Sequence, residues 1–297
     1  MDMGGKSNKL VELKGDINSG NDCKEKESKE NSQEQCSNME SHIVEDQQDQ
    51  NIEAPKEISY DKVIDFDYQK EIKPLLENID NKKANIILLT TGSYNPIHRM
   101  HLEILNIAYN YLLKLEKYNI ICGFISPSAD CYVQYKQPPL IPFELRCKMI
   151  ETAINEYNNE NKDNINFKIF MHKWEGTHDY FIDFPYVIEE IQHQLNKNFK
   201  EYKIALVYVC GMDLYLKCHY SLSRNVIAID RKPYINKKYQ SNEKYLVYLI
   251  EDEKSEPYSS TSIRKAYKNG DHDTIEKVTF PEVAKMIISF YDKYFEK

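Results

Sequence analysis

Two histidines follow a glycine-containing turn, in a pattern suited to binding phosphate. The segment reads Thr91-Gly92-Ser93-Tyr94-Asn95-Pro96-Ile97-His98-Arg99-Met100-His101. His98 and His101 are three residues apart, so they share one face of the helix that we expect after Pro96. The first turn of a helix presents backbone N–H groups to anions, and imidazole N–H groups there can hold phosphate oxygens. Gly92 would let the backbone approach such a ligand closely.

Two other interpretations of an isolated histidine pair are a metal site and a pair of solvated side chains. Zinc-binding pairs on a helix more often lie four residues apart with a Glu between them, whereas Arg99 stands between His98 and His101. The seven cysteines form no Cys-x-x-Cys pair, which argues against a structural zinc site and a disulfide framework. We therefore expect no metal ligated by the protein, and free thiols in a reducing compartment, the cytoplasm or the nucleus.

Charge and hydropathy exclude two classes of partner. The 297 residues include 39 basic and 47 acidic side chains, a net charge of -8, which disfavours nucleic acid as the main partner. No apolar run approaches the roughly 20 residues needed to cross a bilayer, so we expect no membrane partner. The sequence leaves both a monomer and a homo-oligomer open.

The elements that must position the histidines alternate between strands and helices from residue 84 onward. Apolar runs of strand length lie at 85–90, 120–125, 166–171, 204–209, 226–229 and 245–250. Helical spacing or helix-start signals lie at 102–115, 142–157, 187–195, 260–268 and 281–294. This alternation predicts an α/β fold with a doubly wound, Rossmann-like parallel sheet, formed by residues 84–297 as one domain. Ligands of such sheets bind beyond the carboxyl ends of the strands, which is where the histidine turn follows the first strand.

The N-terminal part has a different composition. Residues 1–55 are mostly polar and charged and contain no aromatic residue, so we expect a disordered tail. The tail would serve as a docking arm or be dispensable. Residues 56–83 are transitional, and we expect a short helix there that packs on the domain.

In this context the turn resembles the signature of the HxGH-type nucleotidyltransferase superfamily, with Met100 where many members have Gly. Its form, with an aromatic residue after Gly-Ser and with Met-His at its end, is similar to that of eukaryotic nicotinamide mononucleotide adenylyltransferases. Further segments agree with that family in order along the chain: Ile125-Ser126-Pro127 with Asp130 and Tyr132, Leu140-Ile141-Pro142 with Arg146, Trp174-Glu175 with Phe181, Cys210-Gly211-Met212-Asp213-Leu214, and Ser259-Ser260-Thr261-Ser262-Ile263-Arg264.

The resemblance implies transfer of an adenylyl group from ATP to nicotinamide or nicotinate mononucleotide, with release of pyrophosphate. Mg²⁺ would be bound mainly through the ATP phosphates. The implied catalytic residues are His101, Arg264 and His98. The implied ATP-binding residues are Gly92, Ser93, Tyr94, His98, His101, Lys136, Ser260, Thr261 and Arg264. The implied mononucleotide-binding residues are Ser93, Tyr94, Trp174, Phe181, Gly211, Asp213 and Arg231.

Three departures from the family pattern concern the acceptor. Lys136 alone remains of a run of lysines, Phe184 replaces a Thr, and the second Trp that usually follows Leu214 is missing. Core packing for Trp174 and helix capping for Asp213 remain alternative roles. For the whole protein, two alternatives stay open. One is another HxGH-type adenylyl- or cytidylyltransferase with a pantetheine phosphate or flavin acceptor, and the other is a non-catalytic interaction protein that retains the fold.

Overall fold

The computed structural model describes residues 66–136, 138–161, 167–218, 225–230, 247–251 and 258–296. The expected tail at 1–55 and the proposed phosphate ligand Arg231 lie outside these residues. Within them, no helix is both long enough and apolar enough to cross a membrane.

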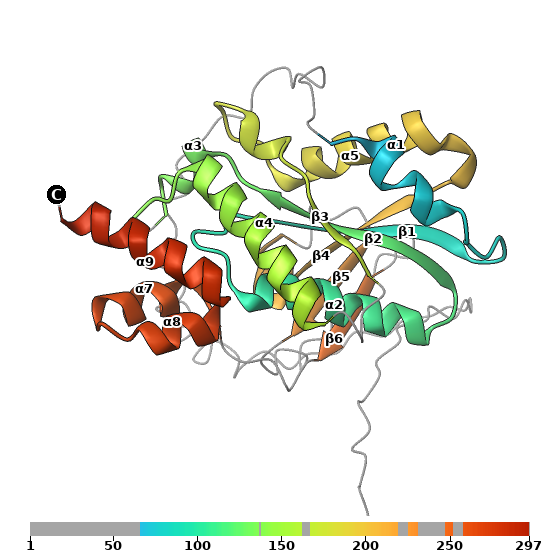
Figure 1. The fold of residues 1–297 in the computed structure, drawn as a ribbon. Helices are drawn as coiled ribbons and strands as arrows, with labels where there is room; N and C mark the ends of the chain where they lie inside the picture. Colours follow the sequence, from blue (N-terminus) through green and yellow to red (C-terminus); the bar gives the residue numbers. More distant parts are fainter. Residues whose placement is uncertain are drawn as a thin grey trace, which may run out of the picture.

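The sheet is parallel throughout its described part (Figure 1), where six strands are ordered β3-β2-β1-β4-β5-β6. The strands are β1 (Ala84–Gly92), β2 (Tyr118–Pro127), β3 (Ile169–Met171), β4 (Ala205–Gly211), β5 (Val226–Asp230) and β6 (Val247–Glu251). The chain winds outward from β1 to β3 and then returns to β4, beside β1. Strand order therefore reverses at the carboxyl ends of β1 and β4, where such sheets bind ligands. The predicted doubly wound α/β fold is confirmed.

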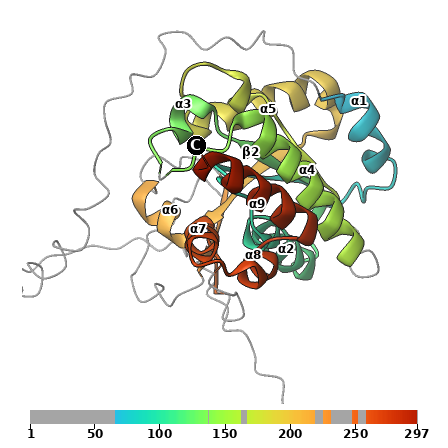
Figure 2. The ribbon, with the colours of Figure 1, turned by 60° about the vertical axis from the view of Figure 1, so that its left-hand side comes forward.

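Helices cover both faces of this sheet (Figures 1 and 2). One layer holds α2 (Arg99–Lys114), α4 (Phe143–Glu160), α7 (Ser260–Lys268), α8 (His272–Val278) and α9 (Pro281–Phe295). The other holds α1 (Tyr68–Glu71), η3 (Lys73–Leu76), α5 (Phe184–Phe199) and α6 (Met212–Cys218). The short elements α3 (Asp130–Val133), η4 (Glu175–Thr177) and η5 (Lys200–Tyr202) lie in the connections.

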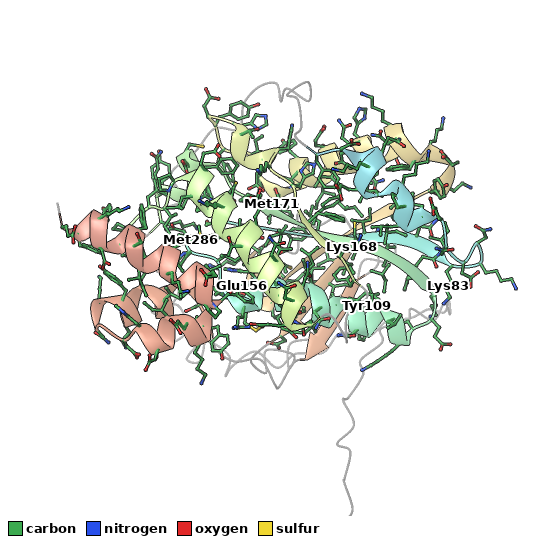
Figure 3. The ribbon with its side chains drawn as sticks, in the orientation of Figure 1. Lys83, Tyr109, Glu156, Lys168, Met171 and Met286 are labelled. Carbon is green, nitrogen blue, oxygen red and sulfur yellow. The ribbon has the colours of Figure 1, made fainter. Side chains whose placement is uncertain are left out.

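Strand β1 explains why both layers form. Ile86 and Leu88 face the layer of α2 and α4, whereas Ile87 and Leu89 face the layer of α5. A central parallel strand is covered on both sides, so its side chains are apolar at successive positions rather than at alternate ones. Figure 3 shows side chains filling both layers, including the contact between α4 and α9 near Glu156 and Met286.

Residues 66–76 complete the second layer. Tyr68, Ile72 and Leu76 are buried in the same cluster as α5. The Tyr68 hydroxyl lies 2.9 Å from Nε2 of His172, which follows β3. The segment before β1 therefore contacts the connection between β3 and Trp174 through this hydrogen bond.

We expect Ile72→Ala to lower the free energy of unfolding by about 3 kcal/mol, because the side chain is fully buried and its removal leaves a cavity. Urea denaturation followed by circular dichroism measures the change. Lys73→Ala, at the adjacent exposed position, is the matched control and should change stability by less than about 0.5 kcal/mol. Equal, small effects of the two substitutions would show that residues 66–76 are not part of the cooperative core.

Candidate active site

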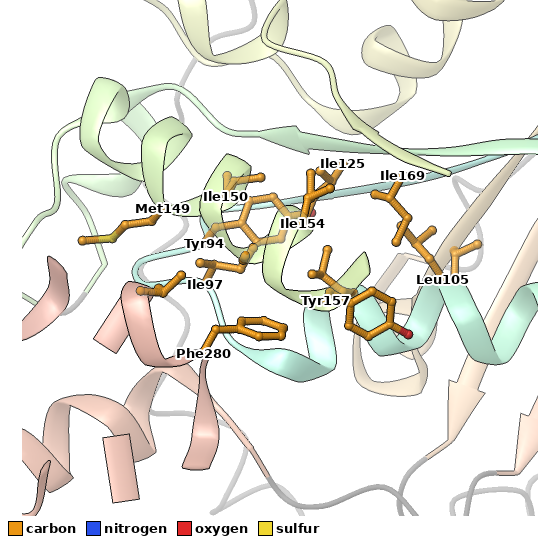
Figure 4. Packing of buried hydrophobic residues seen from close by; sticks show 14 of the residues in the cluster. Tyr94, Ile97, Leu105, Ile125, Met149, Ile150, Ile154, Tyr157, Ile169 and Phe280 are labelled. Atoms are coloured by element: carbon orange, nitrogen blue, oxygen red, sulfur yellow. The ribbon is translucent and has the colours of Figure 1, made fainter. Parts of the chain in front are cut away.

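The turn between β1 and α2 has a backbone conformation set by buried side chains. Tyr94 is 3% exposed and has a φ of 46°, in a left-handed region that few non-glycine residues occupy. A Cβ at Gly92 would lie only 3.2 Å from the Tyr94 ring, so glycine makes room for this packing. Figure 4 shows Tyr94 and Ile97 within the core beside Met149 and Phe280. The turn is therefore shaped by the protein core before any ligand arrives.

The two histidines at the start of α2 form a stacked pair. Their ring centroids are 3.5 Å apart and their planes differ by 26°. The backbone N–H of His98 donates to Nδ1 of His101 at 3.1 Å. Because Nδ1 accepts, the neutral His101 ring carries its proton on Nε2, which makes Nε2–H a hydrogen-bond donor. The ring of His101 also contacts that of Tyr94 in a T-shaped arrangement, with ring centroids 4.8 Å apart, which holds the imidazole in place.

The C-terminal motif meets the same turn from the other end of the sequence. Ser260 Oγ donates to the carbonyl of Pro96 at 2.8 Å, and Arg264 donates to the carbonyl of Asn95 at 2.8 Å. Arg264 also donates to Thr261 Oγ1 at 2.9 Å. Burial lowers the pKa of Arg264, but a guanidinium remains charged in proteins. The structure thus brings together the two segments that the sequence assigns to phosphate.

Two helix N-termini converge here. Helix α2 begins directly after His98, and α7 begins after Ser259, whose Oγ accepts from the Ser262 N–H at 3.0 Å. Each N-terminus carries partial positive charge and unsatisfied N–H groups. Together with Arg264 they make the end of β1 a favourable position for a polyphosphate.

Arg146 organises the loops around this position. Its side chain is fully buried and donates to four acceptors on three segments: the carbonyls of Ser93 (2.7 Å), Ser128 (2.7 Å) and Ile141 (3.0 Å), and Asp130 Oδ1 (2.8 Å). A planar guanidinium holds such acceptors in a fixed arrangement. The turn after β1 and the loop after β2 are therefore fixed relative to each other through α4.

Asn95 adds a second link between the loops. Its Nδ2 donates to the carbonyl of Pro139 at 3.2 Å, and its Oδ1 accepts from the Ile141 N–H at 2.9 Å. The sequence prediction included Asn95 only as part of the turn and Arg146 only as part of a motif. The sequence did contain a signal for the role of Arg146: this arginine lies on the apolar face of the helix expected at 142–157. A charge buried there requires several hydrogen-bond partners.

Glu175 is a buried carboxyl group under the ends of β2 and β3. It is 3% exposed and accepts from Ser126 Oγ at 2.7 Å. Burial raises the pKa of Glu175 to about 7, against the opposing effects of hydrogen bonds from Ser128 and Ser126 and of the charge on Arg146. The next residue, Gly176, has no space for a side chain, because the Phe143 ring occupies the position that a Cβ would take.

The aromatic residues expected at the acceptor ring occupy different environments. Trp174 is 1% exposed and packs inside the second layer, so its ring offers no open face to a ligand. Phe181 is half-buried and stacks on Tyr132, with ring centroids 4.7 Å apart and planes 24° apart. Lys136 Nζ lies 4.7 Å from the Tyr132 ring centroid. The structure thus groups Phe181 with Tyr132 and Lys136.

Phe184, which stands where the family pattern has Thr, points into the core. It stacks on Tyr208 with ring centroids 4.8 Å apart, and the Tyr208 hydroxyl is 2.9 Å from Thr91 Oγ1. Phe184 therefore packs against Tyr208, which contacts the end of β1, and Phe184 does not supply the hydroxyl that the family Thr would have at this position.

Gly211 and Asp213 mark the carboxyl end of β4 and the start of α6. A Cβ at Gly211 would lie 2.5 Å from Asp213 Oδ1, so glycine leaves space for this carboxylate. Asp213 is exposed in the first turn of α6, next to the strand that neighbours β1. Both residues lie at the edge of the sheet where the sequence predicted the acceptor.

The described residues contain no group of three or more His, Cys, Asp or Glu side chains that could hold a metal ion. Imidazole and guanidinium donors at the end of β1 suit an anion. Divalent cations such as Mg²⁺ take oxygen ligands, and phosphate groups supply them.

A family model described as cytidylyltransferase-like matches residues 89–266. Among curated relatives, nicotinamide/nicotinic acid mononucleotide adenylyltransferase 1 of Bos taurus is 39% identical over 74 residues, 25% of this chain and 25% of that protein. Enzyme 2 of the same name from Danio rerio is 36% identical over 75 residues, 25% of this chain and 24% of that protein. The chain thus spans about a quarter of the length of these relatives.

Among solved structures, Plasmodium falciparum nicotinic acid mononucleotide adenylyltransferase complexed with NaAD is similar, with a TM-score of 0.50. It is 22% identical, and the alignment covers 71% of this chain and 97% of that one. At this identity, the likeness supports the fold and nothing more specific.

We expect Arg146→Met to lower the free energy of unfolding by about 3 kcal/mol, because buried acceptors lose their donor. Thermal and urea denaturation measure the loss. Lys148→Met, on the exposed side of the same helix, is the matched control. If the two variants are equally stable, Arg146 does not hold the loops together.

We expect the stability contributed by Glu175 to fall as the pH rises. The folded protein keeps the proton up to about pH 7, whereas the unfolded chain releases it near pH 4.5, so the folded state binds more protons in between. The resulting loss in the free energy of unfolding is about 3 kcal/mol, and it stays constant above about pH 7. Glu175→Gln removes this dependence, so its stability relative to the unmodified protein should increase from pH 4.5 to 7.5. Parallel stability curves for the two proteins would contradict this.

Proposed function

The chain belongs to the cytidylyltransferase-like family, and from this membership we propose that it is an adenylyltransferase. It joins ATP to nicotinamide or nicotinate mononucleotide, forms NAD or deamido-NAD, and releases pyrophosphate. The observation that carries the proposal is the meeting of the His98–His101 pair with Ser260 and Arg264 at the end of β1.

ATP binds with its phosphates at the two helix N-termini. Backbone N–H groups of the Gly92–Tyr94 turn and of α7 contact the phosphate oxygens, together with the hydroxyls of Ser260 and Thr261. Arg264 supplies a permanent positive charge, and Nε2–H of His101 supplies a directed donor from a ring whose orientation is fixed. His98 supports that orientation through the ring stack.

The transfer is an in-line displacement at the α-phosphorus of ATP. An oxygen of the mononucleotide phosphate forms the new P–O bond while the bond to the pyrophosphate leaving group breaks. No protein nucleophile takes part, so the chain contributes alignment and stabilisation of the charge on the α-phosphate and the leaving oxygens. His101 and Arg264 are the residues that we assign to this charge.

The acceptor occupies the side of the site formed by the loops after β2 and β3 and by the start of α6. Phe181 provides the aromatic face for the pyridine ring, and a cationic ring over such a face gains about 0.5–2 kcal/mol. Asp213 and Gly211 contact the ribose or the nicotinamide side. We keep Arg231 as the residue that binds the phosphate of the acceptor. Ser93 and Tyr94 contact the acceptor through their backbone.

Mg²⁺ would be held mainly by the ATP phosphates and by water, and it would screen the charge of the triphosphate. The residues named above orient the phosphates. Among the residues that the structure describes, Cys122, Cys131, Cys147 and Cys210 are free thiols. We keep a reducing compartment, the cytoplasm or the nucleus, as part of the proposal.

With ATP and Mg²⁺, we expect pyrophosphate release to depend on nicotinamide or nicotinate mononucleotide, and the dinucleotide to appear in equal amount. Coupled pyrophosphate detection and chromatography of the product measure the two yields. Release with pantetheine phosphate or a flavin nucleotide alone would favour another transferase of the superfamily. No release with any acceptor would favour a non-catalytic role.

His101→Ala should lower kcat by at least about 100-fold, because a donor that stabilises the transition state is lost. The same change removes the acceptor of the His98 N–H, which would cost about 1 kcal/mol of stability. His101→Gln separates the two effects, because a Gln at this position can restore the cap without restoring the imidazole. A variant with normal stability and near-normal kcat would remove His101 from the transfer step.

A further inference from the structure

The ammonium group of Lys136 lies over one ring of the stacked pair Tyr132–Phe181. The rings are 4.7 Å apart and nearly parallel, and Lys136 Nζ lies 4.7 Å from the Tyr132 ring centroid. Phe181 comes from the connection after β3, whereas Tyr132 and Lys136 come from the connection after β2. Both connections leave the carboxyl edge of the sheet, on the side that we assign to the acceptor.

A series of contacts connects this pair to the proposed transfer site. Tyr132 lies in α3, two residues after Asp130, and Asp130 pairs with Arg146 at 2.8 Å. Arg146 in turn donates to the carbonyl of Ser93 in the turn after β1. Because Asp130 is already paired with Arg146, the charge that Lys136 brings to the aromatic pair is not neutralised by this neighbouring carboxylate.

The two candidate acceptors differ in the charge of their ring. The nicotinamide ring of the mononucleotide is a pyridinium cation with a neutral amide. The nicotinate ring is the same cation with a carboxylate, so it is neutral overall and presents a negative edge. An ammonium group beside the stacking surface repels the first ring and attracts the carboxylate of the second.

We propose that Lys136 is a specificity-determining residue that makes the deamidated mononucleotide the preferred acceptor. This inference rests on the proposed adenylyl transfer and on stacking of the acceptor ring at Tyr132–Phe181. It gives Lys136 a role toward the ring substituent, in place of the phosphate-binding role that the family pattern implies for its lysine run.

The test is the ratio of kcat/KM for nicotinate mononucleotide to kcat/KM for nicotinamide mononucleotide, at saturating ATP and Mg²⁺. The unmodified protein should favour nicotinate. Lys136→Met should lower the ratio by roughly two- to fivefold, as expected for one exposed ion pair. Lys136→Arg should keep the ratio, and Lys136→Glu should lower it below that of Lys136→Met. Lys114→Met, at the opposite end of α2 from the site, is the matched control.

The outcomes separate this inference from the proposed function. An equal loss with both acceptors, or a change only in the KM for ATP, would mean that Lys136 contacts phosphate and would overturn the specificity assignment while leaving adenylyl transfer in place. An unmodified protein that prefers the amide would also overturn it. Absence of product with both acceptors in the unmodified protein would overturn the proposed function and this inference together.

Discussion

A guanidinium group without solvent contact needs acceptors from the protein, and the site of this protein is arranged around Arg146, which donates four hydrogen bonds. Arg146 reaches backbone carbonyls in the turn after β1, in the loop after β2 and at the start of its own helix, and it pairs with Asp130. Because the fork is planar and rigid, these acceptors have little freedom to move independently. Loops that would otherwise vary at the edge of a sheet become parts of one frame.

Both halves of the site depend on that frame. On the side proposed for ATP, the carbonyl of Ser93 is held just before Tyr94, whose left-handed backbone and buried ring shape the approach to His98. On the side proposed for the acceptor, Asp130 is held at the start of α3, which carries Tyr132. The same positive charge also acts on the buried carboxyl of Glu175, where it opposes the effect of burial on the pKa. One interaction thus links the positions of two subsites and the protonation of a neighbouring acid.

The fold followed from the sequence because its signals are local. A run of apolar residues at successive positions predicted the central strand at 85–90, and β1 spans Ala84–Gly92. The turn with Gly92 and the two histidines was recognisable as a turn and a helix start, whereas the phosphate role proposed for the Ser259–Arg264 segment came from the family resemblance, because its local pattern alone indicates only helix capping. Core packing of Trp174, an alternative that the sequence left open, is what the structure shows. The stack of Phe181 on Tyr132 was not predictable, because it depends on how two connections meet in space. Helix α8 was missed, since its short amphipathic stretch has too few apolar positions to show a period.

The contacts between the C-terminal segments and residues 95–97 form only when nearly the whole chain has been synthesised. Ser260 and Thr279 donate to the carbonyls of Pro96 and Ile97, and Arg264 to that of Asn95, across separations of 164, 182 and 169 residues. A nascent chain emerging from the ribosome can form β1, β2 and α2 early, but these three contacts cannot form until α7 and the end of α8, with Thr279, have been synthesised. Contacts of such long range form late in folding. The proposed nucleotide site is therefore one of the last parts of the molecule to be completed, and a chain stalled before Ser260 would lack the contacts that close it.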